Sequence, residues 1–220
     1  MNFFGHAAVA AHFRCEPAFL LGAMLPDFST MILARTPPIA HELMAQGVRF
    51  HHATDDAFHE LESFRDLCRA AFRTLLERGL GRGSARAVAH VGVELVIDEV
   101  LAEAETARRA YISALEISRT AEIEAAMAWQ PGERERYDFL IARLSERGVG
   151  AVPPAGLLAE RLRRTLSGRP RLAFEAGETI VVEEWIVEAR PVVVALVPTL
   201  TEALIAKLRR SMAGPPAATA

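Results

Sequence analysis

Cysteine is scarce in this sequence, and the two cysteines that occur, Cys15 and Cys68, belong to no CxxC pair. A disulfide framework and a thiolate metal site are therefore not expected. No sign of charge dominates either, since 25 Lys and Arg residues oppose 28 Asp and Glu residues, for a formal net charge of −3. This balance gives no electrostatic reason to expect a nucleic acid as a partner.

Segments that would direct or anchor the chain are also not expected. The opening stretch MNFFGHAAVAAHF has no basic region before its apolar residues and contains two histidines, which argues against a signal peptide. The apolar stretch from Val192 to Ala206 is too short to cross a bilayer and contains Pro198 and Glu202. No membrane span is expected, and the expected location is a reducing cytoplasm.

Helical periodicity fills most of the chain, whereas alternating strand patterns are few and no glycine-rich phosphate loop follows a strand. The sequence is 51% apolar over 220 residues, enough to bury a substantial core. We predict an all-α fold, a single-domain multi-helix bundle over residues 1–212 with a disordered tail at 213–220. Helices are expected at about 2–13, then in a short stretch ending near Pro26, and at 39–61, 62–78, 85–104, 106–129, 131–148 and 152–168. Residues 178–212 are expected to form a last long helix or a pair of helices, interrupted at Pro191 and Pro198.

One short segment is unusually rich in groups that bind metals or carry protons. Residues 47–61, GVRFHHATDDAFHEL, hold three of the seven histidines and two aspartates. Residues four apart share a helix face, so His51, Asp55 and His59 form one stripe, with His52 and Asp56 beside it. Imidazole and carboxylate are the ligands that Mn, Fe, Zn and Ni prefer. Because one helix cannot surround an ion, a metal site here needs ligands from other segments.

Three further segments place an acid or an imidazole where apolar residues would be expected. HVGVELVIDEVL spaces His90, Glu94 and Asp98 four residues apart, LGAMLPDFS contains Asp27, and FFGHAAVA contains His6. A carboxylate on an apolar helix face is costly to bury without a partner. The joint occurrence in four segments predicts an interior metal site.

Each of these groups also has a purely structural explanation. His6 could be a hydrogen-bonded core histidine, and Asp27 could be a helix N-cap. Glu94 and Asp98 could pair with Arg82 or Arg86, and the His51 stripe could be a solvated face.

In order along the chain, five segments resemble motifs of the acyl carrier protein phosphodiesterase family, itself similar to HD-domain metal-dependent phosphohydrolases. MNFFGHAAVA resembles the family's opening Met-Asn-Phe-Leu-Ala-His, and LLGAMLPDF its Gly-x-x-x-x-Asp-Phe element. GVRFHHATDDAFH resembles Gly-x-x-x-His-Arg-x-x-Asp-x-x-x-Asp, and GVELVIDEVLA resembles Asp-x-x-x-Asp-His-Phe-Leu. SGRPRLAF resembles a later Arg-Arg-Pro-x-Leu stretch. The resemblance spans residues 1 to about 210 and implies an HD-domain-like helical fold.

The resemblance also implies a divalent metal, foremost Mn, with Zn, Fe or Mg as alternatives. Such an ion lowers the pKa of bound water and neutralises charge that grows on phosphoryl oxygens. The implied substrate is a phosphodiester, for example the 4′-phosphopantetheine-bearing serine of an acyl carrier protein. The implied metal ligands are His51, Asp55 and Asp98, together with His6 or Asp27.

Catalytic roles follow for three more residues if the resemblance holds. Glu94 would orient a ligand imidazole by accepting its second N–H. His59 or His52 would donate a proton to the leaving oxygen, because an imidazole pKa lies near working pH.

The sequence departs from the family pattern at four positions. His52 replaces an arginine, His59 an aspartate, Glu94 an aspartate, and Glu99 the histidine after the second acid. Metal-ligand character survives most of these changes, whereas the charge that would hold a phosphate at position 52 is lost. Two other functions are therefore retained as alternatives: a zinc-dependent, lipase- or phospholipase-like helical hydrolase, and a non-catalytic helical scaffold.

Overall fold

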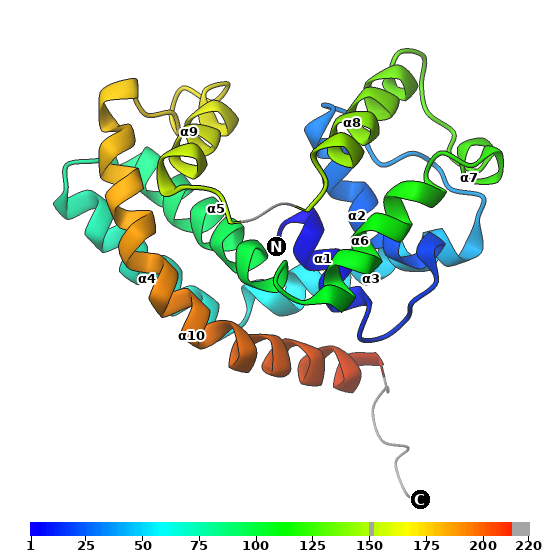
Figure 1. Ribbon diagram of the computed structural model, residues 1–220, viewed down its shortest axis with the longest axis horizontal. Helices are drawn as coiled ribbons and strands as arrows, with labels where there is room; N and C mark the ends of the chain where they lie inside the picture. Colours follow the sequence, from blue (N-terminus) through cyan, green and yellow to red (C-terminus); the bar gives the residue numbers. More distant parts are fainter. Residues whose placement is uncertain (150–151, 213–220) are drawn as a thin grey trace, which may run out of the picture. The chain divides into compact units, whose positions relative to one another are not determined.

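The computed structural model describes residues 1–149 and 152–212. Within them the chain forms ten α-helices and one short 3₁₀ helix, and its only β-type pairing is an isolated bridge between Ile39 and Met127 (Figure 1). The all-α prediction is confirmed. The tail 213–220, predicted to be disordered, lies outside the described residues. A closer likeness to HD-domain proteins stays a prediction.

The helices belong to two compact units. The first unit comprises Met1–Phe58, Leu101–Gly150 and Ala203–Ala220, and the second comprises His59–Val100 and Ala151–Glu202. The first contains α1 (Phe3–Ala10), α2 (Pro17–Met31), nearly all of α3 (Glu42–His59), α6 (Glu105–Ile117), α7 (Ala121–Ala125) and α8 (Glu133–Arg147). The second contains α4 (Glu62–Glu77), nearly all of α5 (Arg82–Leu101), α9 (Ala155–Leu166), η1 (Ala176–Glu178) and most of α10 (Thr179–Met212).

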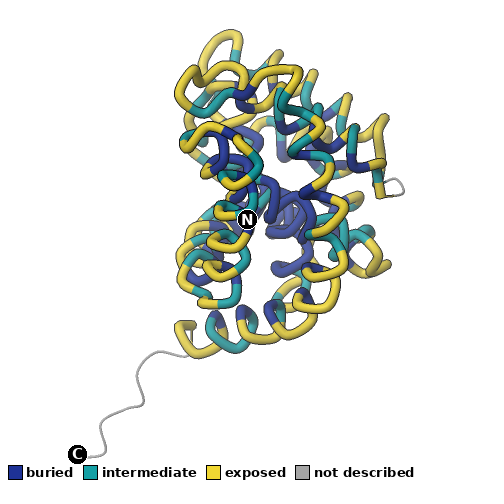
Figure 2. The backbone as a smooth tube through the Cα atoms, turned by 90° about the vertical axis from the view of Figure 1, so that its left-hand side faces the viewer, coloured by how far each residue is buried: buried dark blue, intermediate teal, exposed yellow. Residues whose placement is uncertain are grey.

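The core of the first unit is built around α1. Every residue from Phe3 to Ala10 is buried, as expected for a helix that is apolar on all sides (Figure 2). This helix packs against α2 and α6, which also pack against each other, and α8 packs against α2 and α6. The ring of Tyr111 in α6 contacts the rings of Phe3 and Phe4, with centroid distances of 6.0 and 5.3 Å. His6, in the middle of this helix, is therefore fully buried.

Helices α2 and α3 cross at two glycines. A Cβ placed on Gly22 would lie 2.1 Å from the carbonyl oxygen of Met44, and one on Gly47 would lie 2.2 Å from that of Phe19. Both distances are far inside van der Waals contact, and in both cases the obstacle is backbone. The absence of two side chains thus allows the backbones to touch, which brings the His51 turn of α3 against α2.

Two of the predicted helix boundaries differ from those in the structure. The helix predicted over 106–129 ends at Ile117, and the short α7 follows it. At this break the hydroxyl of Ser118 donates to the Leu115 carbonyl, and that of Thr120 donates to the Ile117 carbonyl. Such local bonds compete with continuation of a helix. The helix predicted to end near Pro26 instead passes through this proline and ends at Met31.

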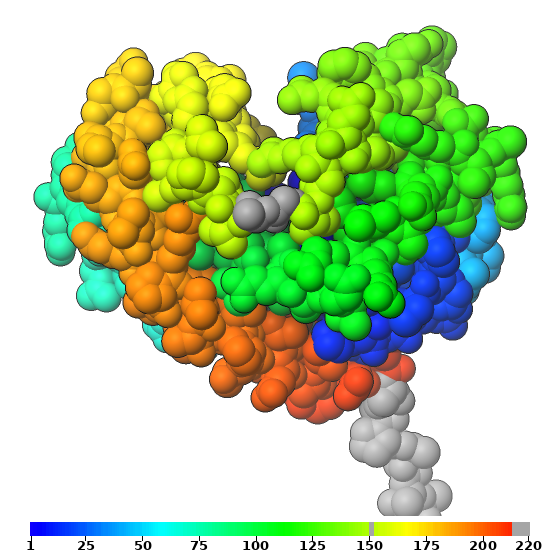
Figure 3. All heavy atoms as spheres, viewed as in Figure 1, coloured from blue at the N-terminus to red at the C-terminus, as the bar shows by residue number. Residues whose placement is uncertain are grey.

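The predicted interruptions of the last helix are also wrong, because α10 runs from Thr179 to Met212 through Pro191 and Pro198. By length and composition, the helical stretch Ala176–Met212 is a candidate membrane span, with 28% of its most apolar window buried. Buried core helices of soluble proteins meet the same criterion. Figure 3 shows α10 (orange) at the surface, where Val187, Val192 and Val194 are exposed. This helix is therefore long enough to cross a bilayer, whereas the apolar stretch from Val192 to Ala206 alone is too short.

The second unit contains an almost buried ion pair that fixes α5 against α10. Arg190 donates to both carboxylate oxygens of Glu99, at 3.0 and 3.1 Å, and to the Pro153 carbonyl at 2.6 Å. The Glu99 side chain is only 10% exposed. Burial raises the pKa of Glu99, although the hydrogen bonds from Arg190 oppose that rise. Glu99 is therefore tied to a structural partner.

Replacing Arg190 by methionine should lower the free energy of unfolding by about 3 kcal/mol at pH 7, because Glu99 stays buried without its cation. The pKa of Glu99 would then rise further above its unfolded value, so the loss should shrink as the pH falls from 7 toward 5. Urea unfolding at both pH values measures this, and adding Glu99→Gln should restore stability. Arg164→Met, which breaks an exposed pair with Glu160, should cost under about 0.5 kcal/mol at either pH. An equal loss in both variants would contradict the prediction.

Candidate metal centre

Three helices of the first unit bring two imidazoles and a carboxylate together. His6 comes from α1, Asp27 from α2 and His51 from α3, and one potential ligand atom of each lies within 4.8 Å of the others. Both histidines are buried, at 0% and 3% exposure. Their rings stack with a centroid distance of 3.8 Å. The predicted convergence of separate helices is present for these three residues.

The ring of His51 is oriented by the backbone of α2. Its Nδ1 lies 2.8 Å from the carbonyl oxygen of Ala23, which makes Nδ1 the N–H donor and leaves Nε2 without a proton in the neutral ring. Burial, together with the nearby His6, lowers the pKa of His51 to about 3. The ring is therefore neutral at physiological pH, the form in which imidazole binds a metal.

Asp55 lies one turn beyond His51 and completes the polar cluster. Its Oδ1 is 3.3 Å from His6 Nε2 and 3.0 Å from the Met1 ammonium nitrogen. Burial alone would raise the pKa of Asp55, but the His6 hydrogen bond and the Met1 ammonium hold it well below its usual range. Asp27 Oδ2 lies 4.0 Å from the same nitrogen. Two carboxylates therefore lie close to His6 Nε2.

The structure excludes two of the purely structural explanations, one for Asp27 and one for His51. Asp27 lies inside α2, ten residues after its first residue Pro17, so the N-cap explanation is wrong. The His51 stripe is not simply a solvated face, because His51 is buried.

The other half of the predicted stripe belongs to a different cluster in the second unit. His59, at the end of α3, has its Nε2 3.2 Å from Glu94 Oε1, and His90 Nε2 lies 3.3 Å from the same oxygen. Burial would raise the pKa of Glu94, but the hydrogen bonds with the two histidines hold it well below its usual range. The pairing of Glu94 with Arg82 or Arg86 is wrong, because those arginines form no ion pair within the described part of the chain.

Two further predicted residues lie on α3 and α5. His52 is exposed on α3, with its ring edge-on to His51 at a centroid distance of 5.3 Å. Asp98 is half-buried on α5, one turn after Glu94, and belongs to the second unit. The role of Asp98 as a ligand of a metal ion shared with His51 stays a prediction. The catalytic roles of His52, His59 and Glu94 also stay predictions.

His90 received no role from the sequence, although it is a member of the second cluster. Its four-residue spacing from Glu94 was visible, but its partner His59 lies thirty-one residues earlier on another helix. Only the fold brings that histidine to the His90–Glu94 face.

Comparison of the chain with models of known protein families, with curated proteins and with solved structures found no match.

Proposed function

We propose that the chain is a metal-dependent phosphohydrolase acting on phosphodiesters, with its metal bound by His6, Asp27, His51 and Asp55. The observation that carries the proposal is the meeting of His6, Asp27 and His51 from three helices within 4.8 Å. Two nitrogen and two carboxylate donors suit Mn, Fe or Zn, and the carboxylates favour the harder Mn among them.

The protonation states of these ligand residues, as well as their types, suit a divalent ion. His51 is held neutral, with Nδ1 bound to the Ala23 carbonyl and Nε2 available. Asp55 is held ionised by His6 and the Met1 ammonium. A divalent ion bound here would lower the pKa of bound water and neutralise charge on phosphoryl oxygens. The ligand atoms therefore need little reorganisation of charge in order to bind it.

The protein groups around this ion would have distinct tasks. The Ala23 carbonyl fixes the His51 ring, as outer hydrogen-bond partners of metal-binding histidines do. His52, exposed and next in sequence to His51, would give a proton to the leaving oxygen. The narrower proposal, release of 4′-phosphopantetheine from an acyl carrier protein, rests on the resemblance of the motifs.

Metal exchange on the purified chain tests this function. Chelation should lower the melting temperature, and Mn should restore it together with turnover of bis-p-nitrophenyl phosphate. Holo acyl carrier protein is the second substrate, and release of 4′-phosphopantetheine would support the narrower proposal. Cleavage of p-nitrophenyl acetate without any action on phosphodiesters would favour the lipase-like alternative. An unchanged melting temperature and no turnover with any metal would leave the helical scaffold.

A further inference from the structure

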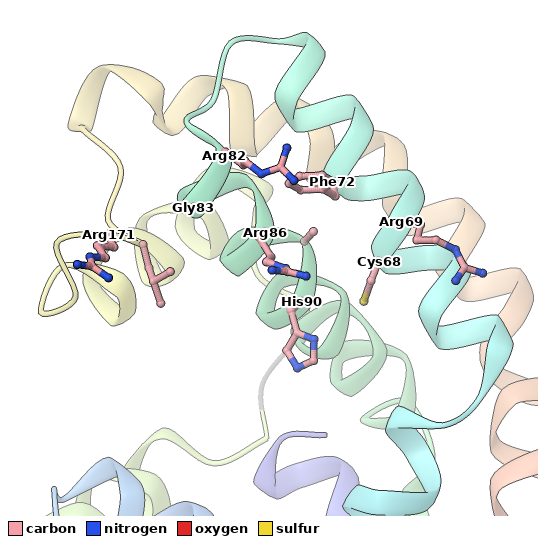
Figure 4. A pocket seen from close by; sticks show the side chains of 10 residues that line it. Cys68, Arg69, Phe72, Arg82, Gly83, Arg86, His90 and Arg171 are labelled. Atoms are coloured by element: carbon pink, nitrogen blue, oxygen red, sulfur yellow. The ribbon is translucent and has the colours of Figure 1, made fainter.

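One face of α5 carries a row of chemically active side chains that the proposed function does not use. Arg82, Arg86, His90 and Glu94 follow one another at four-residue intervals, so they share a face of the helix. Figure 4 shows the side chains of Arg86 and His90 on the same side of α5, at the pocket between α5, α4 and the segment around Arg171. The row runs from two cations to an imidazole and then to a carboxylate.

The far end of this row has the composition and spacing of a metal site. One potential ligand atom each of His59, His90 and Glu94 lies within 4.8 Å of the others. An ion with bonds of about 2.0–2.1 Å holds tetrahedral ligand atoms about 3.3 Å apart, since the edge of a tetrahedron is about 1.63 times the bond length. Glu94 Oε1 lies 3.2 Å from His59 Nε2 and 3.3 Å from His90 Nε2. Both separations match that edge.

The three residues are buried to different degrees, as expected for a metal site that a ligand can reach from solvent. The Glu94 side chain is 10% exposed, whereas the His59 and His90 side chains are 35% and 46% exposed. A carboxylate anchored in the interior and two imidazoles at the surface leave the solvent side of the cluster open. Three protein ligands with an open fourth position are the arrangement of zinc sites that bind an exogenous ligand.

The pocket beside the cluster suits an anion. It has a volume of about 540 Å³ and is lined by Arg69, Arg82, Arg86, His90 and Arg171 among others. Glu62 and Asp66 pair with Arg69, but within the described residues Arg86 and Arg171 form no ion pair. The guanidinium of Arg82 stacks over the Phe72 ring at 5.8 Å, which holds it at the pocket wall. Guanidinium groups bind phosphate oxygens in a planar, bidentate manner.

We propose that His59, His90 and Glu94 bind a zinc-type divalent ion whose open coordination position faces the arginine-lined pocket, and that this site binds a phosphate-bearing ligand. The site lies wholly in the second unit and uses none of the four ligands proposed for the ion at His51. The zinc-site proposal can therefore be tested separately from the proposed phosphohydrolase function.

Metal stoichiometry of the full chain tests the ion. After chelation and reloading with Zn²⁺, His90→Ala and His90→Gln should each bind one ion fewer than the wild type. Gln retains a hydrogen bond to Glu94, so its melting temperature in chelator should stay unchanged. His12→Ala is the matched control, because His12 is likewise an exposed histidine and lies in the other unit. Co²⁺ loading supplies a second readout, a visible absorption band typical of tetrahedral coordination that the His90 variants should lose.

Phosphate titration of the zinc-loaded chain tests the anion. Arg86→Gln should weaken binding of inorganic phosphate about tenfold, whereas Arg119→Gln, an exposed arginine in the first unit, should not. Glycerol phosphate and vesicles containing phosphatidic acid serve as further probes, and the tighter of the two identifies a free or a lipid-borne phosphate. Unchanged zinc content in both His90 variants would show a hydrogen-bonded triad only and would overturn the proposal. Phosphate binding that ignores both zinc and Arg86 would overturn the ligand assignment.

The His51 site is separable in the same assay. His51→Gln should abolish the Mn-dependent turnover and leave the ion at His90 in place. Loss of both ions in one His90 variant would instead contradict the independence of the two sites.

Discussion

Replacement of Gly47 by alanine is expected to lower the free energy of unfolding by about 3 kcal/mol or more. The new Cβ would lie 2.2 Å from the Phe19 carbonyl oxygen and 2.8 Å from the Ala23 nitrogen, and both are backbone atoms of α2 that no rotamer change can move. Overpacking of this kind costs about 1–3 kcal/mol even where side chains can yield. Helix propensity alone predicts the opposite sign, because alanine favours a helix over glycine by about 1 kcal/mol. The direction of the change therefore reports directly on the crossing of the two helices.

Urea unfolding in the presence of chelator measures this effect without a contribution from metal. Gly168→Ala is the matched control, since a Cβ at Gly168 meets no atom within 4 Å, and its change should stay within about 0.5 kcal/mol. Because separation of α2 from α3 would also move Ala23 away from His51, the Gly47 variant should lose part of its metal-dependent rise in melting temperature. A stabilised Gly47→Ala protein would show that the helices do not touch at this point.

The second large effect is expected for Asp55→Asn. This change keeps the size of the side chain but removes the charge shared by His6, the Met1 ammonium and the proposed ion. Loss of partners that only orient a metal ligand lowers affinity or activity about 10–100-fold, so loss of a ligand should reduce Mn-dependent phosphodiester hydrolysis about 100-fold or more. Steady-state turnover of bis-p-nitrophenyl phosphate at saturating Mn measures it.

The neighbouring residue supplies the control. Asp56 is exposed and carries the same charge, so Asp56→Asn changes the net charge equally at an adjacent position. Its activity should remain within about twofold of the wild type. Equal losses in the two variants would mean that Asp55 acts only through general electrostatics, and the metal-ligand role would be withdrawn.

Helical periodicity was sufficient to predict the all-α fold, since apolar residues recur at helical spacing in nearly every segment. It failed at individual helix ends. Ser118 and Thr120 have unexceptional helix propensities, yet α6 ends at Ile117, where their hydroxyls bond to the carbonyls of Leu115 and Ile117. Pro191 and Pro198 were expected to stop a helix, yet α10 continues through both. Intrinsic preference is a weak guide against tertiary packing.

The candidate site was predictable in its residue types but not in its grouping. Four-residue spacing placed His51, Asp55 and His59 in one stripe, and the structure divides that stripe between two clusters. His51 turns toward α1 and α2 because two glycines allow close approach there, whereas His59 meets α5. The spacing of residues along one helix predicts which side chains share a face. It does not predict which other helix packs against each end of that face.

The complete enclosure of α1 has a consequence for how the protein is made. The helix leaves the ribosome about a hundred residues before α6, one of the two helices that enclose it, has been synthesised. At translation speeds of about 5–20 residues per second, several seconds or longer pass between the synthesis of α1 and that of α6. The aromatic side chains of α1 lack this packing partner for that time. During that interval the nascent chain presents its most apolar segment to the cell, a natural binding target for chaperones.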